Sequence, residues 1–163
     1  MTIREYNNCV DEYSDGVYRF LLKNIRNADL ASDIVQESFL KLWLKRKNVD
    51  YAKSKSYLFT TAYHGMIDHT RKRNWNDQHV DDHLIYKIEG FENSYSDIKE
   101  ILDVALEKLP SIQKSVVLLR DYEGYSYQEI GEITDLNEAQ VKVYIYRARM
   151  SLKKYLVSID LVI

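Results

Sequence analysis

Near the carboxyl end of the sequence, one predicted helix carries side chains suited to binding nucleic acid. Its apolar residues recur at i, i+4, i+7 and i+11 and must face a core: Val141, Ile145, Ala148 and Leu152. The opposite face mixes cations, which contact phosphates, with side chains that reach base edges or thymine methyl groups in the major groove. That outward set is Gln140, Lys142, Val143, Tyr146 and Arg147. A helical hairpin with a solvated basic face fits the same spacing, so both interpretations stay open.

Catalytic and metal-binding patterns are weak in this chain. No glycine-rich phosphate loop occurs, and no nucleophile can be paired with a base from its spacing. His79 and His83 stand four residues apart without a convincing third ligand, so we expect no metal site. Cys9 is the single cysteine, which excludes an internal disulfide and a thiolate cage. We therefore expect a binding protein that needs no cofactor and is not an enzyme.

A helix-turn-helix is the element predicted to position the outward set. Two isoleucines give the apolar side of a short first helix, and Gly131 permits the close approach of a crossing helix. Residues 134–136 form the predicted turn. The side chain of Asn137 can cap the second helix, while Gln140 reaches back in a capping box.

The stretch DIVQESFLKLWL, residues 33–44, predicts a helix with two apolar sides. The first side is Val35, Phe39, Leu42 and Trp43. Leu40 and Leu44 fall on the opposite side, beside Asp33 and Glu37. A surface helix that buries one face would not place leucines there. Either another part of this chain covers them, or a partner protein does.

The whole sequence predicts an almost entirely helical protein in the cytoplasm. Only one proline and five glycines occur among 163 residues, and helical periodicity dominates. The N-terminus lacks an apolar signal core and no apolar run is long enough to cross a membrane, so we expect no membrane partner. A net charge of −2 excludes a general polyanion binder. Residues 76–95 are acidic and aperiodic, as in a linker between helical segments.

Three stretches together resemble the extracytoplasmic-function (ECF) sigma factors of the bacterial sigma-70 family. They read DIVQESFLKLW, SYLFTTAYHGMIDHTRKR and LPSIQKSVVLLRDYEGYSYQEIGEITDLNEAQVKVYIYRARMSLKKYL. The resemblance implies an all-α fold, with sigma domain 2 at 1–75, an acidic linker at 76–95 and sigma domain 4 at 96–163. It also implies a factor that binds core RNA polymerase and directs promoter recognition and DNA melting.

For the two-sided helix, the resemblance implies docking on the clamp helices of the largest polymerase subunit, with two leucines inside a polar rim. The implied contact residues are Asp33, Gln36, Glu37, Leu40, Lys41 and Leu44. Sigma domain 4 would meet the polymerase flap. The alternative is that the chain's own N-terminal helix covers the two leucines.

The resemblance places recognition of the minus-ten promoter element on the loop at 48–55 and on the helix that follows. Capturing a flipped base there requires stacking and basic side chains that offset the cost of extrusion. The implied residues are Tyr51, Lys53, Lys55, Tyr63, His64, Arg71, Lys72 and Arg73. The cluster at 71–73 also suits an ordinary helix C-terminus, where cations are favourable. The outward set of the helix-turn-helix would read the minus-thirty-five element.

Two motifs depart from the pattern common in the family. Residues 140–144 read QVKVY where Thr-Val-Lys-Ser-Arg is common, and residues 63–64 read Tyr-His where Arg-Asn is usual. We therefore expect altered promoter reading, and we hypothesise that a DNA-bound recruiting protein assists it. An anti-sigma factor is a further partner that the sequence leaves open. A polymerase-independent dimeric regulator is the rival function, although it has no use for the leucines at 40 and 44.

Overall fold

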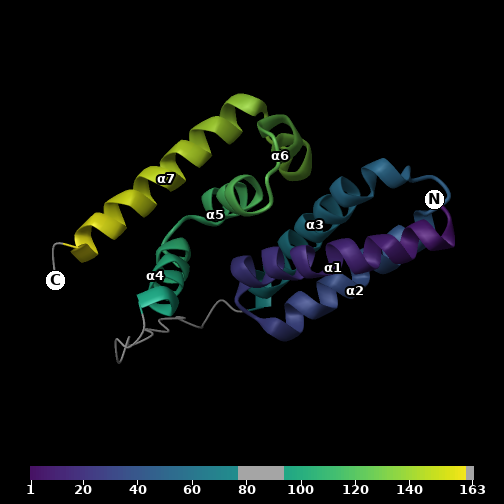
Figure 1. Cartoon of the computed structure of the whole chain (residues 1–163), viewed down its shortest axis with the longest axis horizontal. Coiled ribbons are helices and arrows are strands. Elements are labelled where there is room, and N and C mark those ends of the chain that lie inside the picture. The colour runs from purple at the N-terminus through teal and green to yellow at the C-terminus, as the bar shows by residue number, and fades with distance from the viewer. Residues whose placement is uncertain (77–93, 161–163) are drawn as a thin grey trace.

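The computed structural model describes residues 1–76 and 94–160, and every element within those ranges is helical (Figure 1). The predicted all-α fold is therefore confirmed. Most of the acidic linker, with His79 and His83, lies outside the described residues. In chain order the elements are α1 (Ile3–Ile25), α2 (Ala28–Lys45), the short 3-10 helix η1 (Tyr51–Lys53), α3 (Ser54–Asn76), α4 (Ser94–Glu107), α5 (Ser111–Val117), the π-helical turn η2 (Leu118–Tyr122), α6 (Tyr127–Thr134) and α7 (Glu138–Asp160).

The first three long helices pack against one another and form what we call the first lobe, residues 1–76 (Figure 1). Helix α1 begins with a capping box, in which Thr2 and Glu5 each accept the other's backbone N–H. It ends at Arg26 in the left-handed conformation. Asn27 then caps α2 by accepting from the backbone N–H of Leu30 at 3.0 Å. These adjacent stop and start signals turn the chain within two residues.

Apolar side chains from all three helices fill the interior of the first lobe. Phe20 of α1, Leu42 of α2 and Phe59 of α3 are each buried to 1% exposure or less. Cys9 is equally buried, with its thiol 3.7 Å from the sulfur of Met1. Burial raises the pKa of this thiol. The lobe thus has its own continuous core, which holds α2 in one orientation.

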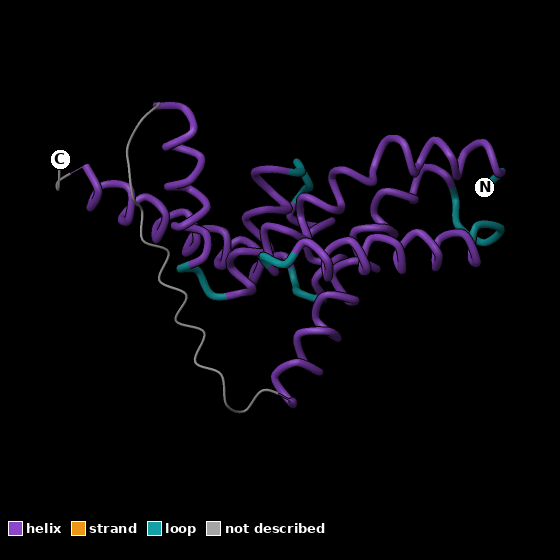
Figure 2. Tube along the Cα trace, turned by 90° about the horizontal axis from the view of Figure 1, so that it is seen from below, coloured by secondary structure: helices purple, strands orange, loops and turns teal. Residues whose placement is uncertain are grey.

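The second lobe, residues 94–160, contains α4 to α7. Helix α5 packs against α7 and runs into the π-helical turn η2, after which Gly124 adopts a positive φ of 75°. Ser126 then starts α6 with a second capping box, made with Glu129. Figure 2, which views the trace from below, shows the helices joined by short loops in this lobe. None of the described helices combines the length and apolar character that a membrane crossing needs.

The two lobes touch each other. Helix α3 packs against α6, and the carboxyl half of α1 lies against α5 (Figure 1). Phe59 and Tyr125 meet edge to face across this boundary, with their ring centroids 5.3 Å apart. The boundary matters for function, because several of the predicted site residues lie on it.

Candidate functional site

The outer face of α2 is open to solvent along its whole length. Leu40 is 56% exposed and Leu44 is 71% exposed, whereas Leu42 between them is fully buried. The described part of the chain therefore does not cover the two leucines. Of the two explanations offered by the sequence, the one in which the chain's own N-terminal helix covers them does not hold here.

Polar residues surround these leucines on the same face of α2. All six residues predicted to bind the polymerase are exposed: Asp33, Gln36, Glu37, Leu40, Lys41 and Leu44. Glu37 pairs with Lys41 at 2.9 Å, and this hydrogen bond lowers the pKa of the Glu37 carboxyl. His69 of α3 lies 3.7 Å from the same carboxylate. The result is an apolar pair inside a charged rim, an arrangement typical of protein interfaces.

The end of α2 is held in place by aromatic stacking. The guanidinium of Arg46 lies 3.9 Å above the ring of Trp43, and Tyr6 of α1 meets that ring edge to face. The N-terminal ammonium of Met1 donates to the carbonyl of Arg46 at 3.0 Å. These contacts fix the last turn of the helix, so Leu44 projects from a rigid support.

The residues predicted for the minus-ten element divide into accessible and covered ones. Lys53 of η1 is exposed, as are Arg71 and Lys72 near the end of α3. Tyr51 is half-buried against the core of the first lobe. The side chain of Arg73 lies outside the described residues. A cationic surface is thus available at both ends of α3.

Tyr63 and His64, in the middle of α3, contact the second lobe. Tyr63 is only 7% exposed, and burial raises the pKa of its phenol, with a smaller contribution from the nearby Asp135 carboxylate. His64 Nε2 lies 3.1 Å from Asp135 Oδ2, at the end of α6. Lys55 lies over the ring of Tyr125, 4.9 Å from its centroid. These three predicted site residues therefore have neighbours that belong to the other lobe.

The residues predicted for the minus-thirty-five element share one exposed face of α7. Gln140, Lys142, Val143, Tyr146 and Arg147 are all exposed, and Tyr146 is 65% accessible. The predicted capping box also forms, since Gln140 accepts from the backbone N–H of Asn137 at 3.0 Å and Asn137 accepts from that of Gln140 at 2.8 Å. The carbonyl oxygen of the Gln140 side chain is therefore already engaged with its own helix start.

Met150, which is not among the predicted site residues, is 49% exposed on the same helix. It follows Val143 and Tyr146 at i+7 and i+4, so the helical spacing could have identified it. Arg149, also not predicted, makes two hydrogen bonds to Asp121 of η2, the shorter at 2.6 Å. This contact ties the helix to the π-helical turn and has a structural role. In the described ranges, no three potential ligands come together to hold a metal ion.

Comparison with known proteins identifies the two lobes. The family model for sigma-70 region 2 matches residues 9–76, and the model for sigma-70 region 4 matches residues 99–152. The ECF RNA polymerase sigma factor SigM of Bacillus subtilis is 31% identical over 147 residues, which cover 86% of this chain and 88% of SigM. RNA polymerase sigma factor SigV of the same organism is 31% identical over 154 residues, covering 94% of this chain and 92% of SigV.

A solved structure supports the same fold. The sigma factor RpoE from Bartonella quintana, crystallised with the anti-sigma factor NepR, superposes with a TM-score of 0.79 at 23% identity and covers 94% of this chain and 98% of its own. The members of this family are non-catalytic initiation factors. The chain belongs to the ECF sigma factors of the sigma-70 family, and it is an RNA polymerase sigma factor for transcription initiation rather than a polymerase-independent regulator.

Proposed function

We propose that the outer face of α2 is the surface by which this sigma factor binds core RNA polymerase, at the clamp helices of the largest subunit. The observation that carries the proposal is the exposure of Leu40 and Leu44 on a helix whose other side is anchored in a core. Burying two leucines gives a favourable apolar contact, and the charged rim gives orientation. The contact set is the predicted one: Asp33, Gln36, Glu37, Leu40, Lys41 and Leu44.

We assign one DNA-binding role to each lobe. We assign recognition and melting of the minus-ten element to η1, α3 and their basic ends, and reading of the minus-thirty-five element to the exposed face of α7. The functional domains would then be residues 1–75 and 96–163, with the linker at 76–95. Exposed cations at both DNA-facing surfaces support these assignments.

The test for the polymerase surface is the double substitution Leu40→Asp, Leu44→Asp. Placing two carboxylates where apolar contact is needed should weaken binding to purified core polymerase by about 2 kcal/mol or more, which is about thirtyfold in Kd. Binding is measured by fluorescence anisotropy of the labelled sigma factor, and promoter-dependent RNA synthesis should fall in parallel.

The matched control is Ile3→Asp, because Ile3 is 60% exposed at the start of α1, outside the proposed contact set and outside the lobe assigned to the flap. Its affinity for core polymerase should stay within about twofold of the wild type. Circular dichroism checks that both variants keep their helical content. Equal affinities for the α2 variant and the control would refute the proposed docking surface.

Further partners belong to the same proposal. The structure of RpoE from Bartonella quintana contains a bound anti-sigma factor. We propose that an anti-sigma factor also binds this chain. We assign contact with the polymerase flap to the second lobe. Because residues 63–64 and 140–144 depart from the common family pattern, we also propose that a DNA-bound protein recruits this factor to its promoters. The chain itself performs no catalysis, needs no cofactor and works in the cytoplasm with the polymerase.

A further inference from the structure

The centre of the exposed face of α7 carries a side chain without any hydrogen-bonding group. Val141, Ile145 and Ala148 form the buried stripe of this helix, each at 1% exposure or less. With about 3.6 residues per turn, Val143 lies nearly opposite the middle of that stripe. Val143 is 45% exposed. The residue that points most directly away from the core therefore presents only methyl groups to a bound molecule.

The polar residues one turn before and one turn after Val143 offer hydrogen-bond donors. The side-chain oxygen of Gln140 accepts from the backbone N–H of Asn137 at 3.0 Å, which leaves the amide NH2 as its free group. The guanidinium of Arg147 is exposed and can only donate. A bidentate contact between a glutamine and adenine needs an acceptor and a donor on the same amide. Gln140 cannot make that contact while it caps the helix.

Hydrogen-bond acceptors near this face lie away from its centre. The Glu138 carboxylate is paired with Lys142 at 3.3 Å, and helical periodicity places both residues at one edge of the face. Tyr146, whose hydroxyl can donate or accept, lies between that edge and Val143. Tyr144 is half-buried and packs against the core of the protein. A base at the centre of the face therefore meets an apolar side chain.

The length of this face matches the major groove of DNA. Gln140 and Arg147 are separated by about 10 Å along the helix axis, and the groove is about 12 Å wide. Val143 lies between them, within the first two turns of α7, where recognition helices contact base edges. Val157 is 49% exposed on the same helix, but it lies about 21 Å beyond Val143 and therefore outside the groove.

Thymine is the base whose major-groove edge suits an apolar side chain. It alone among the four bases presents a methyl group there, on C5. Contact between this methyl group and Val143 removes two apolar surfaces from water, which is favourable. The other bases would bring polar edge groups against Val143, and these would lose water without gaining a hydrogen bond. Attraction and desolvation thus both favour thymine at this place.

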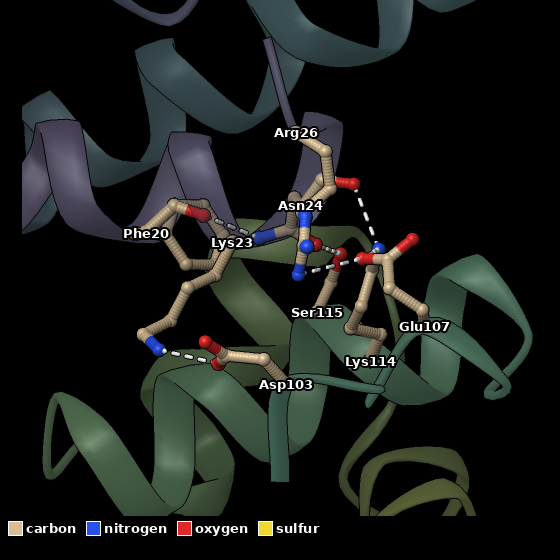
Figure 3. Close-up of polar contacts among 8 residues, drawn as sticks. All are labelled: Phe20, Lys23, Asn24, Arg26, Asp103, Glu107, Lys114 and Ser115. Atoms are coloured by element: carbon tan, nitrogen blue, oxygen red, sulfur yellow. Dashed lines mark hydrogen bonds and ion pairs between the residues drawn. The ribbon is translucent and has the colours of Figure 1, made fainter. Parts of the chain in front are cut away.

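The outward face of α7 takes no part in the polar contacts that join the two lobes in Figure 3. There the Lys114 ammonium donates to the backbone carbonyl of Asn24 at 2.8 Å, and the Ser115 hydroxyl donates to the side-chain oxygen of Asn24 at 2.7 Å. Helix α7 instead packs its buried side against α5 and α6. Val143 is therefore presented on a supported helix and is accessible to DNA in the full chain.

We propose that Val143 reads the C5 methyl group of a thymine in the minus-thirty-five element. This inference rests on the assignment of α7 to that element made above, and it adds the base and the chemical group that are recognised. Serine is common at this position in the family, and its hydroxyl can bond to polar base edges. The valine of this chain exchanges a polar contact for an apolar one, so the preferred base changes with it.

The test removes a single methyl group from the DNA. The full chain first selects duplexes from a library with a randomised segment, and the enriched sequence supplies a fluorescein-labelled probe. Each thymine of the probe is then replaced in turn by uracil, which lacks only the C5 methyl group. Fluorescence anisotropy measures the affinity of the full chain for each duplex. We expect uracil at one position to weaken binding about fourfold, the effect of exposing one methyl group.

Three variants assign that effect to one side chain. Val143→Ser should bind the thymine and uracil probes with equal affinity, because it has no methyl group to pack against the base. Val143→Ile keeps a branched apolar side chain and should keep the fourfold difference. Val157→Ser is the matched control, the same substitution at a similarly exposed position of α7, and it should also keep the difference. Circular dichroism checks that all three variants retain their helical content.

Two results would overturn this reading of thymine. One is a selected site in which no replacement of thymine by uracil weakens binding of the wild-type chain. The other is a uracil effect as large in Val143→Ser as in the wild type, which would assign the methyl contact to a different side chain. Failure of the assignment of α7 to duplex DNA would show differently, because Arg147→Ala would then bind the selected duplex as tightly as the wild type.

Discussion

At Gly131 a single backbone atom, the carbonyl oxygen of Leu136, leaves no room for a side chain. A Cβ at this position would lie 2.6 Å from the carbonyl oxygen of Leu136, where the turn after α6 folds back. The same turn is closed by a hydrogen bond from the Leu136 N–H to the Gly131 carbonyl at 3.1 Å. The sequence predicted a close approach at Gly131, and the approaching group is the backbone of the turn itself. Any larger residue must displace that backbone.

At the residue scale we therefore predict that Gly131→Ala destabilises the protein by about 1–3 kcal/mol, as overpacking of a tight site does. Thermal unfolding followed by circular dichroism should show a melting temperature lower by several degrees. Gly16→Ala is the matched control, because Gly16 lies inside α1 and its added methyl group would meet nothing closer than 3.4 Å. The free energy of unfolding of that variant should equal the wild-type value or exceed it by about 0.5–1 kcal/mol, since alanine favours a helix. Equal losses in the two variants would contradict the argument.

The first turns of α7 contain residues that cap the helix and, further along, a residue predicted to bind DNA. Asn137 and Gln140 cap the helix through reciprocal hydrogen bonds of 3.0 and 2.8 Å. Arg147, two turns later, is exposed on the same helix. Gln140 and Arg147 should therefore respond differently to substitution, although the sequence placed both in the same predicted DNA-binding set.

At the element scale we predict that Gln140→Ala lowers the free energy of unfolding by about 0.5–1 kcal/mol through loss of the cap. Arg147→Ala should leave stability unchanged, but weaken binding to a mixed-sequence DNA duplex and reduce the salt dependence of that binding by about one phosphate contact. Urea denaturation and anisotropy at several salt concentrations measure the two effects. A stability loss in Arg147→Ala equal to that in Gln140→Ala would contradict this division.

Helical periodicity explains which parts of the site could be predicted from the sequence. The exposure of Leu40 and Leu44, and the buried side of α7 at Val141 and Ile145, follow from spacing within one helix. The contact between His64 and Asp135 could not be predicted in this way. It depends on α6, which approaches α3 only in the tertiary structure. Local patterns specify the faces of an element, whereas contacts between lobes depend on residues distant in the sequence.

At the scale of the whole molecule, the boundary between the two lobes contains Tyr125. This residue is 5% exposed, and its hydroxyl has no hydrogen-bond partner among the described residues. Burial raises the pKa of this phenol well above its usual range, with smaller contributions from nearby carboxylates. A pKa that is higher in the folded state stabilises the fold below the unfolded value of about 10, and this contribution is lost as the pH rises above it.

We predict that Tyr125→Phe is more stable than the wild type by about 1 kcal/mol at neutral pH, because it removes an unpaired buried hydroxyl. Its stability should also fall less between pH 9 and pH 11. Urea denaturation at a series of pH values tests both statements. A variant that is less stable than the wild type at neutral pH would show that the hydroxyl has a favourable role in the boundary.

The burial of Cys9 within the first lobe has a practical consequence. Thiol-directed reagents need both access and a thiolate, and this side chain offers little of either, because its surroundings enclose it and raise its pKa. A cysteine introduced on the surface will therefore react with a maleimide dye far faster than the native one. Fluorophore pairs can be attached across the molecule without first removing its own sulfhydryl.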